Sequence, residues 1–246
     1  MARFDSQVAI IIGGSKGLGR GAVEALRKQG ARVLVIARDA EQLSAVAKET
    51  GAEAIPGDAT DDALAGRLLR ECKPDLVVLC AGASPPLGSV HEQTWESFSK
   101  NWGVDTKATF QWLRHALTVP MKPNSHIVVV SSGAAVRGSP VSGGYASAKR
   151  AQWFIADYAA TESQRASLGL RIHVLLPALN PSTELGRAGI AAYAARAGVT
   201  PEEFAKKFHP PVTPEVMGQA VVDLHADPGR YDKLAYALAG TGLSPA

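Results

Sequence analysis

The sequence has few of the features that mark several large protein classes. It contains only two cysteines, Cys72 and Cys80, which is too few for a disulfide framework and favours reduced thiols. No stretch reaches the roughly 18 consecutive apolar residues of a membrane-spanning helix. The first six residues lack the charged and then apolar layout of a signal peptide. We therefore expect a cytoplasmic protein with no membrane partner.

Strong charge and metal-ligand spacing are also missing. The formal net charge is only +3 and the basic residues are scattered, so we expect a small-molecule partner and no nucleic acid. No HExxH motif or cysteine pair accompanies the histidines, and we predict no metal site. We interpret all six as surface or packing residues: His91, His115, His126, His173, His209 and His225.

Short apolar runs recur along the 246 residues, and segments of helical period separate them. The runs are Val8–Ile12, Val33–Ile36, Leu76–Leu79, Ile127–Val130 and Ile172–Leu176. Because they are apolar throughout, they are typical of strands buried on both faces. The pattern predicts one α/β domain spanning residues 1–246, a doubly wound, Rossmann-type parallel sheet with helices on both faces.

Proline and glycine interrupt this alternation of apolar runs and helical segments between Pro177 and Pro214. The short amphipathic pieces there predict a small helical lid over a substrate cleft, at about residues 181–211.

A glycine-rich turn follows the first strand and leads directly into a helical pattern. Glycine at 13, 17 and 19 leaves room for a dinucleotide pyrophosphate, and the helix start offers unpaired N–H groups. The alternative is a turn that serves tight packing alone. The expected cofactor contacts in this turn are Gly13, Ser15, Lys16, Gly17, Leu18 and Gly19.

The end of the second strand indicates which nicotinamide cofactor fits. Ala37 stands where an NAD-type site usually has an acid, and Arg38 follows it. Asp39 lies past the strand end, where it is predicted to cap a helix. With Lys16 as a second cation, we expect NADP(H) rather than NAD(H), although both cations could instead be solvated surface charges.

Acid–base chemistry is suggested by three residues that come after the fifth strand. Ser132 follows the fifth strand, Tyr145 comes thirteen residues later, and Lys149 lies four residues further on. A spacing of four places Tyr145 and Lys149 on one helix face. A free phenol titrates near 10, and a neighbouring ammonium favours the phenolate, which helps a tyrosine to exchange protons near neutral pH.

In this order and spacing, the glycine turn, Ser132 and Tyr145-Ala-Ser-Ala-Lys149 resemble the short-chain dehydrogenase/reductase family over essentially the whole chain. The resemblance implies a sheet of about seven parallel strands. It implies that Tyr145 is the general acid/base, that Lys149 binds the nicotinamide ribose and favours the phenolate, and that Ser132 holds the carbonyl oxygen.

Further residues match the family's cofactor site. The resemblance implies adenine contacts after the third and fourth strands, and contacts to the nicotinamide and phosphates after the sixth. These residues are Asp58, Ala59, Cys80, Ala81, Gly82, Pro177, Ala178, Ser182 and Thr183.

The chain also departs from the family pattern. Ile12 replaces a threonine, Cys80 an asparagine and Ala178 a glycine. Asp105 stands where the family has a catalytic asparagine that connects a water to the lysine. We hypothesise that Asp105 fills this place and accepts hydrogen bonds, and the alternative is that it only stabilises a helix bend.

Together these features predict an NADP(H)-dependent oxidoreductase that interconverts a carbonyl and a secondary alcohol. The alternative from another class is a catalytically silent NADP-binding sensor or scaffold. A family member that isomerises or dehydrates its substrate around the same tyrosine is a third possibility. By analogy with the family, Trp153, Phe154 and Tyr158 are expected to pack against another subunit in a homo-oligomer, a tetramer or a dimer.

Overall fold

A computed structural model describes residues 3–246, and their strands form a single sheet. The strands are β1 (Val8–Ile12), β2 (Arg32–Ala37), β3 (Glu53–Pro56), β4 (Leu76–Leu79), β5 (His126–Val130), β6 (Arg171–Pro177), β7 (Ala235–Ala239) and β8 (Gly242–Pro245). Their order in the sheet is β3-β2-β1-β4-β5-β6-β7-β8. Neighbouring strands from β3 to β7 pair in parallel, and β8 pairs antiparallel with β7.

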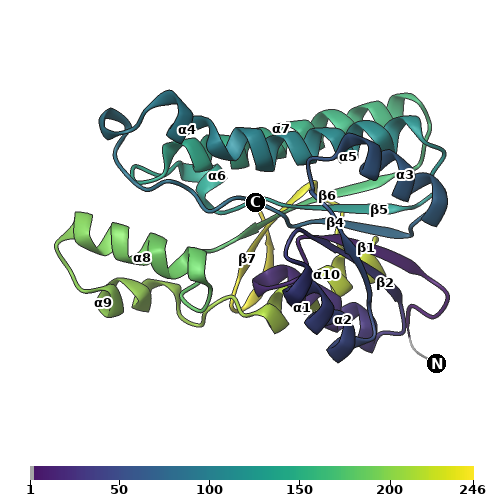
Figure 1. The fold of residues 1–246 in the computed structure, drawn as a ribbon, viewed down its shortest axis with the longest axis horizontal. Coiled ribbons are helices and arrows are strands. Elements are labelled where there is room, and N and C mark those ends of the chain that lie inside the picture. Colours follow the sequence, from purple (N-terminus) through teal and green to yellow (C-terminus); the bar gives the residue numbers. More distant parts are fainter. Residues whose placement is uncertain (1–2) are drawn as a thin grey trace.

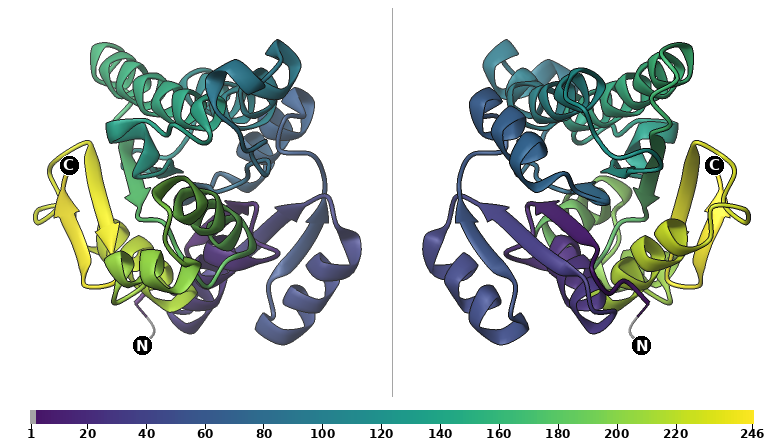
Figure 2. Two further views of the ribbon diagram at one scale, coloured as in Figure 1. Left: turned by 90° about the vertical axis from the view of Figure 1, so that its left-hand side faces the viewer. Right: turned by 90° about the vertical axis from the view of Figure 1, so that its right-hand side faces the viewer.

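Helices cover both faces of this sheet (Figures 1 and 2). They are α1 (Gly17–Lys28), α2 (Ala40–Thr50), α3 (Asp62–Cys72), α4 (Trp95–Asn101), α5 (Lys107–Thr118), α6 (Ala134–Arg137), α7 (Gly143–Arg165), α8 (Glu184–Ala197), α9 (Pro201–Ala205) and α10 (Pro214–Ala226). The helices α1, α2 and α10 pack on one face, and α3, α5 and α7 pack on the other. No helix within residues 3–246 is long and apolar enough to cross a membrane.

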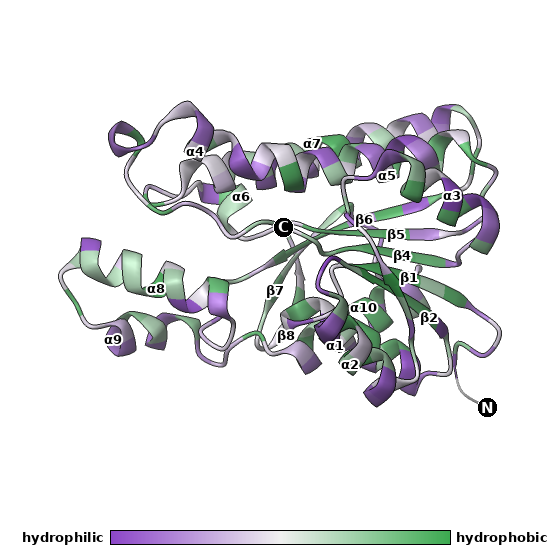
Figure 3. Cartoon of the chain, in the orientation of Figure 1, coloured by the Kyte–Doolittle hydropathy of each residue, from purple (hydrophilic) through white to green (hydrophobic). Residues whose placement is uncertain are grey.

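The strands are apolar throughout because helices cover both faces of the sheet. Successive side chains of a strand point to opposite faces, so both sets must be apolar when helices lie on both sides. In β1, Ala9 and Ile11 join the core beneath α1 and α10, whereas Ile10 and Ile12 join the core beneath α3 and α5. Figure 3 shows largely hydrophobic strands between helices that carry both hydrophilic and hydrophobic residues.

Aspartate side chains cap two helix starts, and the first of them, Asp39, was predicted from the sequence. Asp39 accepts a hydrogen bond from the Gln42 nitrogen at 3.0 Å, and Asp61 accepts one from the Leu64 nitrogen at 3.1 Å. Such caps stabilise a helix by about 1 kcal/mol each.

The doubly wound fold is confirmed, and the sheet contains one strand more than expected. Seven strands are parallel as predicted, and the short antiparallel β8 was not anticipated. The chain reverses its direction of winding between β1 and β4. In open α/β sheets, ligands bind at such a switch point, beside the carboxyl ends of the strands.

Candidate active site

The turn between β1 and α1 is packed too closely for side chains at two of its glycines. Gly13 has a φ of +85°, and a Cβ there would lie 2.5 Å from the Ala81 nitrogen. A Cβ on Gly19 would lie 2.1 Å from the Gly13 carbonyl oxygen. The helix α1 has no side-chain cap and no acid in its first turn. Its N–H groups and the positive end of its dipole therefore suit an anion.

Two cations border this turn, and they differ in their surroundings. Arg38 is exposed directly after β2, and Asp39 beside it caps α2 as predicted. The Lys16 Nζ lies 3.2 Å from the Glu184 Oε2, at the first residue of α8. Both side chains of that pair are largely exposed, so the ion pair contributes little stability and Lys16 can exchange partners.

The predicted acid after β3 is held by its own turn. The Asp58 Oδ1 accepts hydrogen bonds from the Thr60 nitrogen and hydroxyl, both at 2.8 Å. These two bonds, the backbone one first, lower the pKa of the Asp58 carboxyl. The neighbouring Ala59 is buried, and its carbonyl accepts a hydrogen bond from the Trp112 indole at 3.0 Å.

The turn after β4 faces the glycine turn from the other side. The Cys80 sulfur lies so close to Gly19 that a Cβ on this glycine would be 3.3 Å from it. Burial raises the pKa of the Cys80 thiol to about 11, against a smaller lowering by Lys149. Cys80 is therefore a neutral thiol at physiological pH and fills space between the two turns.

Lys149 projects from α7 into the interior at the end of β5. Its Nζ donates a hydrogen bond to the Val130 carbonyl at 3.2 Å and lies 5.6 Å from the centre of the Tyr145 ring. Only 5% of the residue is exposed. Burial acts against the charge on the ammonium, but Asp105 and then Tyr145 outweigh it and raise the lysine pKa. The structure thus brings Tyr145 and Lys149 together as the spacing predicted.

Asp105 is fully buried and forms a direct ion pair with Lys149. Its Oδ2 lies 3.3 Å from the lysine Nζ, and its Oδ1 accepts a hydrogen bond from the Ala83 nitrogen at 2.8 Å. It sits in a π-helical turn, Trp102–Thr106, between α4 and α5. Asn101, one turn earlier, donates to the Ala83 carbonyl at 2.8 Å. Asp105 therefore accepts hydrogen bonds and pairs with the ammonium of Lys149, and its part in proton transfer stays a prediction.

Ser132 lies at the start of the segment that leads from β5 into α6. Its hydroxyl oxygen accepts a hydrogen bond from the Ala134 nitrogen at 3.2 Å, which leaves its proton available to a ligand oxygen. The next residue, Gly133, donates to the Pro177 carbonyl at 2.9 Å. This bond ties the end of β6, where Pro177 and Ala178 lie, to the serine segment.

The hydroxyl groups of Ser182 and Thr183, which follow β6, form hydrogen bonds within their own turn. Thr183 caps α8 by accepting a hydrogen bond from the Gly186 nitrogen at 3.1 Å, and Ser182 donates to the Asn180 side chain at 2.8 Å. The Thr183 methyl is the atom nearest to a Cβ built on Gly17, at 3.9 Å. This loop consequently faces the glycine turn.

Several contacts near the site had no local signal in the sequence. The Tyr193 hydroxyl of α8 donates to the Ser139 hydroxyl at 2.5 Å, and the Tyr193 ring stacks on Phe204 of α9 with ring centres 5.6 Å apart. The hydrogen bond joins residues 54 positions apart in the sequence, so spacing arguments could not find it, whereas the stacked rings lie on consecutive helices. Spacing arguments could not find the Asp105–Lys149 pair either.

Sequence comparisons place this geometry in a known family. Residues 7–195 match the short chain dehydrogenase family. The uncharacterized oxidoreductase YghA of Escherichia coli (strain K12) is 29% identical over 189 residues, which are 71% of this chain and 63% of that protein. The L-fucose dehydrogenase of Mus musculus is 27% identical over 183 residues, 72% of this chain and 66% of that protein. The match thus spans less than two thirds of both relatives.

Solved structures share the fold at low sequence identity. A xylitol dehydrogenase bound to NAD+ superposes with a TM-score of 0.82 at 18% identity, covering 96% of this chain and 99% of that chain. A levodione reductase superposes with a TM-score of 0.81 at 22% identity, covering 96% and 97%. With the family match over most of its length, the chain belongs to the short-chain dehydrogenase family of oxidoreductases.

Proposed function

We propose that the protein is an NADP(H)-dependent oxidoreductase that interconverts a carbonyl group and a secondary alcohol. The main support is the buried Lys149 ammonium, held 5.6 Å from the Tyr145 ring at the carboxyl end of β5. A cation placed there favours the phenolate, so that Tyr145 can give up and take back a proton.

In the direction of reduction, the Tyr145 hydroxyl donates its proton to the substrate oxygen, and in oxidation the phenolate accepts the alcohol proton. The Ser132 hydroxyl donates a hydrogen bond to the same oxygen and stabilises its developing charge. Lys149 favours the phenolate and would bind the nicotinamide ribose when the cofactor is present.

The residues around the glycine turn fit a dinucleotide. Side chains at Gly13 and Gly19 would collide with the neighbouring backbone, so the absence of side chains there opens the approach to the start of α1. We assign the phosphates to this helix start and to Ser182 and Thr183, whose hydroxyls would exchange their present contacts with Asn180 for the phosphates. We assign the adenosine to Asp58 and the turn after β4. When bound, the cofactor supplies or accepts the hydride.

We assign the 2′-phosphate of NADP(H) to Arg38 and Lys16. Ala37 at the end of β2 offers no carboxylate to a ribose 2′-hydroxyl, which favours NADP(H) over NAD(H). Lys16 would exchange its exposed partner Glu184 for the phosphate.

We propose that Asp105 sets the net charge around the proton-transferring pair of Tyr145 and Lys149, which we call the relay. By pairing directly with Lys149 it holds the ammonium in place, and it also offsets part of the positive field that acts on Tyr145. Oxidation of an alcohol should therefore require a higher pH than it would with a neutral residue at position 105.

We further propose that residues 181–211 form the substrate lid. Its helices α8 and α9 extend beyond the carboxyl ends of the strands (Figure 1). The Tyr193–Ser139 hydrogen bond links the lid to the segment between α6 and α7.

The protein is also proposed to form a homo-oligomer through α5 and α7. Phe110, Phe154 and Tyr158 on these helices are 50%, 44% and 62% exposed, and the latter two rings stack on each other. A partner subunit would bury these exposed aromatic rings.

The test is the decrease in NADPH absorbance with a panel of ketones and aldehydes. We expect turnover of at least one carbonyl compound with NADPH, and slower turnover with NADH. Tight binding of NADPH without turnover of any compound would instead favour the silent sensor or scaffold.

A further inference from the structure

Three buried histidines form a continuous chain near the amino-terminal ends of the strands, far from the catalytic residues. His126 begins β5, His173 lies in β6, and His225 lies in the last turn of α10. The His126 Nε2 is 2.7 Å from the His173 Nδ1, and the His126 Nδ1 is 3.3 Å from the His225 Nδ1. The ends of the chain contact the Tyr231 carbonyl at 3.0 Å and the Gln7 Oε1 at 2.8 Å.

Three neutral histidines supply one N–H proton too few for the hydrogen bonds of this chain. Its four contacts need one proton each, and both end groups are oxygens that can only accept. Three neutral imidazoles carry three N–H protons, so one contact remains unsatisfied unless Gln7 rotates its amide to donate. A fourth proton, which makes one ring an imidazolium, satisfies all four contacts with Gln7 as it stands.

An uncompensated cation opposes this fourth proton. The Arg171 Nη2 lies 3.4 Å from the His225 Nδ1, and burial lowers the Arg171 pKa. Within residues 3–246, no carboxylate pairs with Arg171, and its Nη1 is buried without a hydrogen-bond partner. The remaining Arg171 hydrogen bonds are long, at 3.4 Å to the Asn124 carbonyl and 3.2 Å to the His225 carbonyl.

The other charged groups around the chain do not compensate Arg171. Asp75, which precedes β4, faces His225 and raises its pKa, but both of its oxygens lie 2.9 Å from the Lys122 Nζ. Arg3 adds a further positive charge near the chain. The Tyr231 carbonyl and the Tyr236 ring also contact His173, and neither supplies a carboxylate.

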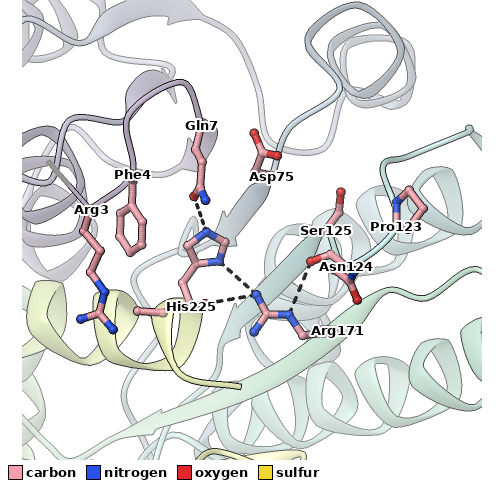
Figure 4. Close-up of a pocket in the computed structure, with 10 residues that line it drawn as sticks. Arg3, Phe4, Gln7, Asp75, Pro123, Asn124, Ser125, Arg171 and His225 are labelled. Atoms are coloured by element: carbon pink, nitrogen blue, oxygen red, sulfur yellow. Dashed lines mark hydrogen bonds between the residues drawn. The ribbon is translucent and has the colours of Figure 1, made fainter. Parts of the chain in front are cut away.

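A cavity of about 330 Å³ lies beside Arg171 and His225 (Figure 4). Its polar lining includes Arg3, Gln7, Asn124, Ser125, Arg171 and His225, and also the carboxylate of Asp75, which is paired with Lys122. An oxyanion there would be attracted by the positive charge of the guanidinium. It would also cancel the charge that opposes protonation of the histidine chain.

We propose that this cavity binds a small oxyanion, a carboxylate, phosphate or sulfate group, through Arg171, and that the anion binds together with one proton taken up by the histidine chain. The site is separate from the catalytic residues, because Arg171 begins β6 whereas Ser132 and Pro177 lie at the opposite ends of the strands. Anion and proton stabilise each other's binding, as linkage requires.

Calorimetric titration with sodium sulfate tests the proposal, since sulfate does not itself titrate between about pH 5 and 8. NADPH is present to occupy the phosphate site of the cofactor. We expect affinity to rise by up to about tenfold for each pH unit on acidification in this range. In buffers of different ionisation enthalpy, we expect the uptake of close to one proton per sulfate near pH 5.5 and almost none near pH 8.

Two variants locate the site independently of the cofactor. Arg171→Gln should abolish this sulfate binding and leave turnover unchanged. Arg32→Gln is the matched control, because Arg32 begins β2 at the same sheet edge but is already paired with Glu53 at 2.7 Å; it should bind sulfate like the parent. Equal binding by the parent and Arg171→Gln, or binding without proton uptake, would overturn the proposal.

If Arg171→Gln does not fold, an NMR pH titration of the histidine ring nitrogens in the parent protein tests the proposal. Sulfate should move the titration of His126, His173 or His225 to higher pH, and unchanged titration at saturating sulfate would contradict the proposal.

Discussion

Acidification should destabilise the protein through His225 before most carboxylates titrate. Burial, and after it the charge of Arg171, lowers the pKa of His225 from 6.5 to about 4. The unfolded chain therefore binds a proton below about pH 6.5, whereas the folded protein does not bind one until about pH 4. Stability is fully present above about pH 6.5 and is lost as the pH falls toward 4.

The size of this loss follows from the two pKa values. The complete effect of His225 is about 3 kcal/mol, and about 2 kcal/mol of it is lost by about pH 5. His225 is only 8% exposed, so solvent screening reduces this figure little. Burial also lowers the pKa values of His126 and His173, which adds to the loss in the same direction.

Urea unfolding at a fixed protein concentration, in chloride buffers without oxyanions, measures the effect. Removing the ring with His225→Gln should reduce the loss between about pH 7.5 and 5 by about 2 kcal/mol. The exposed His91 provides the control, and His91→Gln should keep the slope of the parent. Parallel profiles for His225→Gln and the parent would refute the reasoning.

Three further predictions concern the active site. Arg38→Ala should raise the KM for NADPH by about 10- to 100-fold and leave the KM for NADH nearly unchanged, because one charge-assisted bond to the 2′-phosphate is lost; equal changes for both cofactors would contradict the assignment. Asp105→Asn should shift the pH profile of alcohol oxidation to lower pH, since Lys149 no longer shares its charge with a carboxylate; an unchanged profile would remove Asp105 from the relay. Gly13→Ala should weaken NADPH binding by more than about tenfold in a fluorescence titration, because position 13 has a φ of +85° and a Cβ there would collide with Ala81. Gly103→Ala is the control and should bind NADPH normally, because no atom lies within 4 Å of a Cβ at position 103.

The sequence was sufficient where a structural feature depends on local pattern. The limits of β1 and β4 agree with the predicted runs, and β2, β5 and β6 extend one residue beyond them at one or both ends. Such runs are decisive because both faces of a central parallel strand are buried. β8 was missed because Gly242–Pro245 is short, lies at the sheet edge and has no fully buried residue, so burial left no pattern in it.

Within the site, the helical spacing of Tyr145 and Lys149 predicted their proximity. The direct pairing of Asp105 with Lys149 depends on a π-helical turn and on the packing of that turn against α7, which no local spacing encodes. The histidine chain depends on β5, β6 and α10 meeting in three dimensions. Contacts of this kind become visible only once the topology is known.

The central claim is that the Tyr145 phenol transfers the proton. The most direct test is the single-turnover rate of Tyr145→Phe with NADPH and a carbonyl substrate of the parent, together with the Kd for NADPH. We predict that the rate falls by about 10²- to 10⁴-fold with an almost unchanged Kd. A variant that reduces the substrate as fast as the parent would contradict the account.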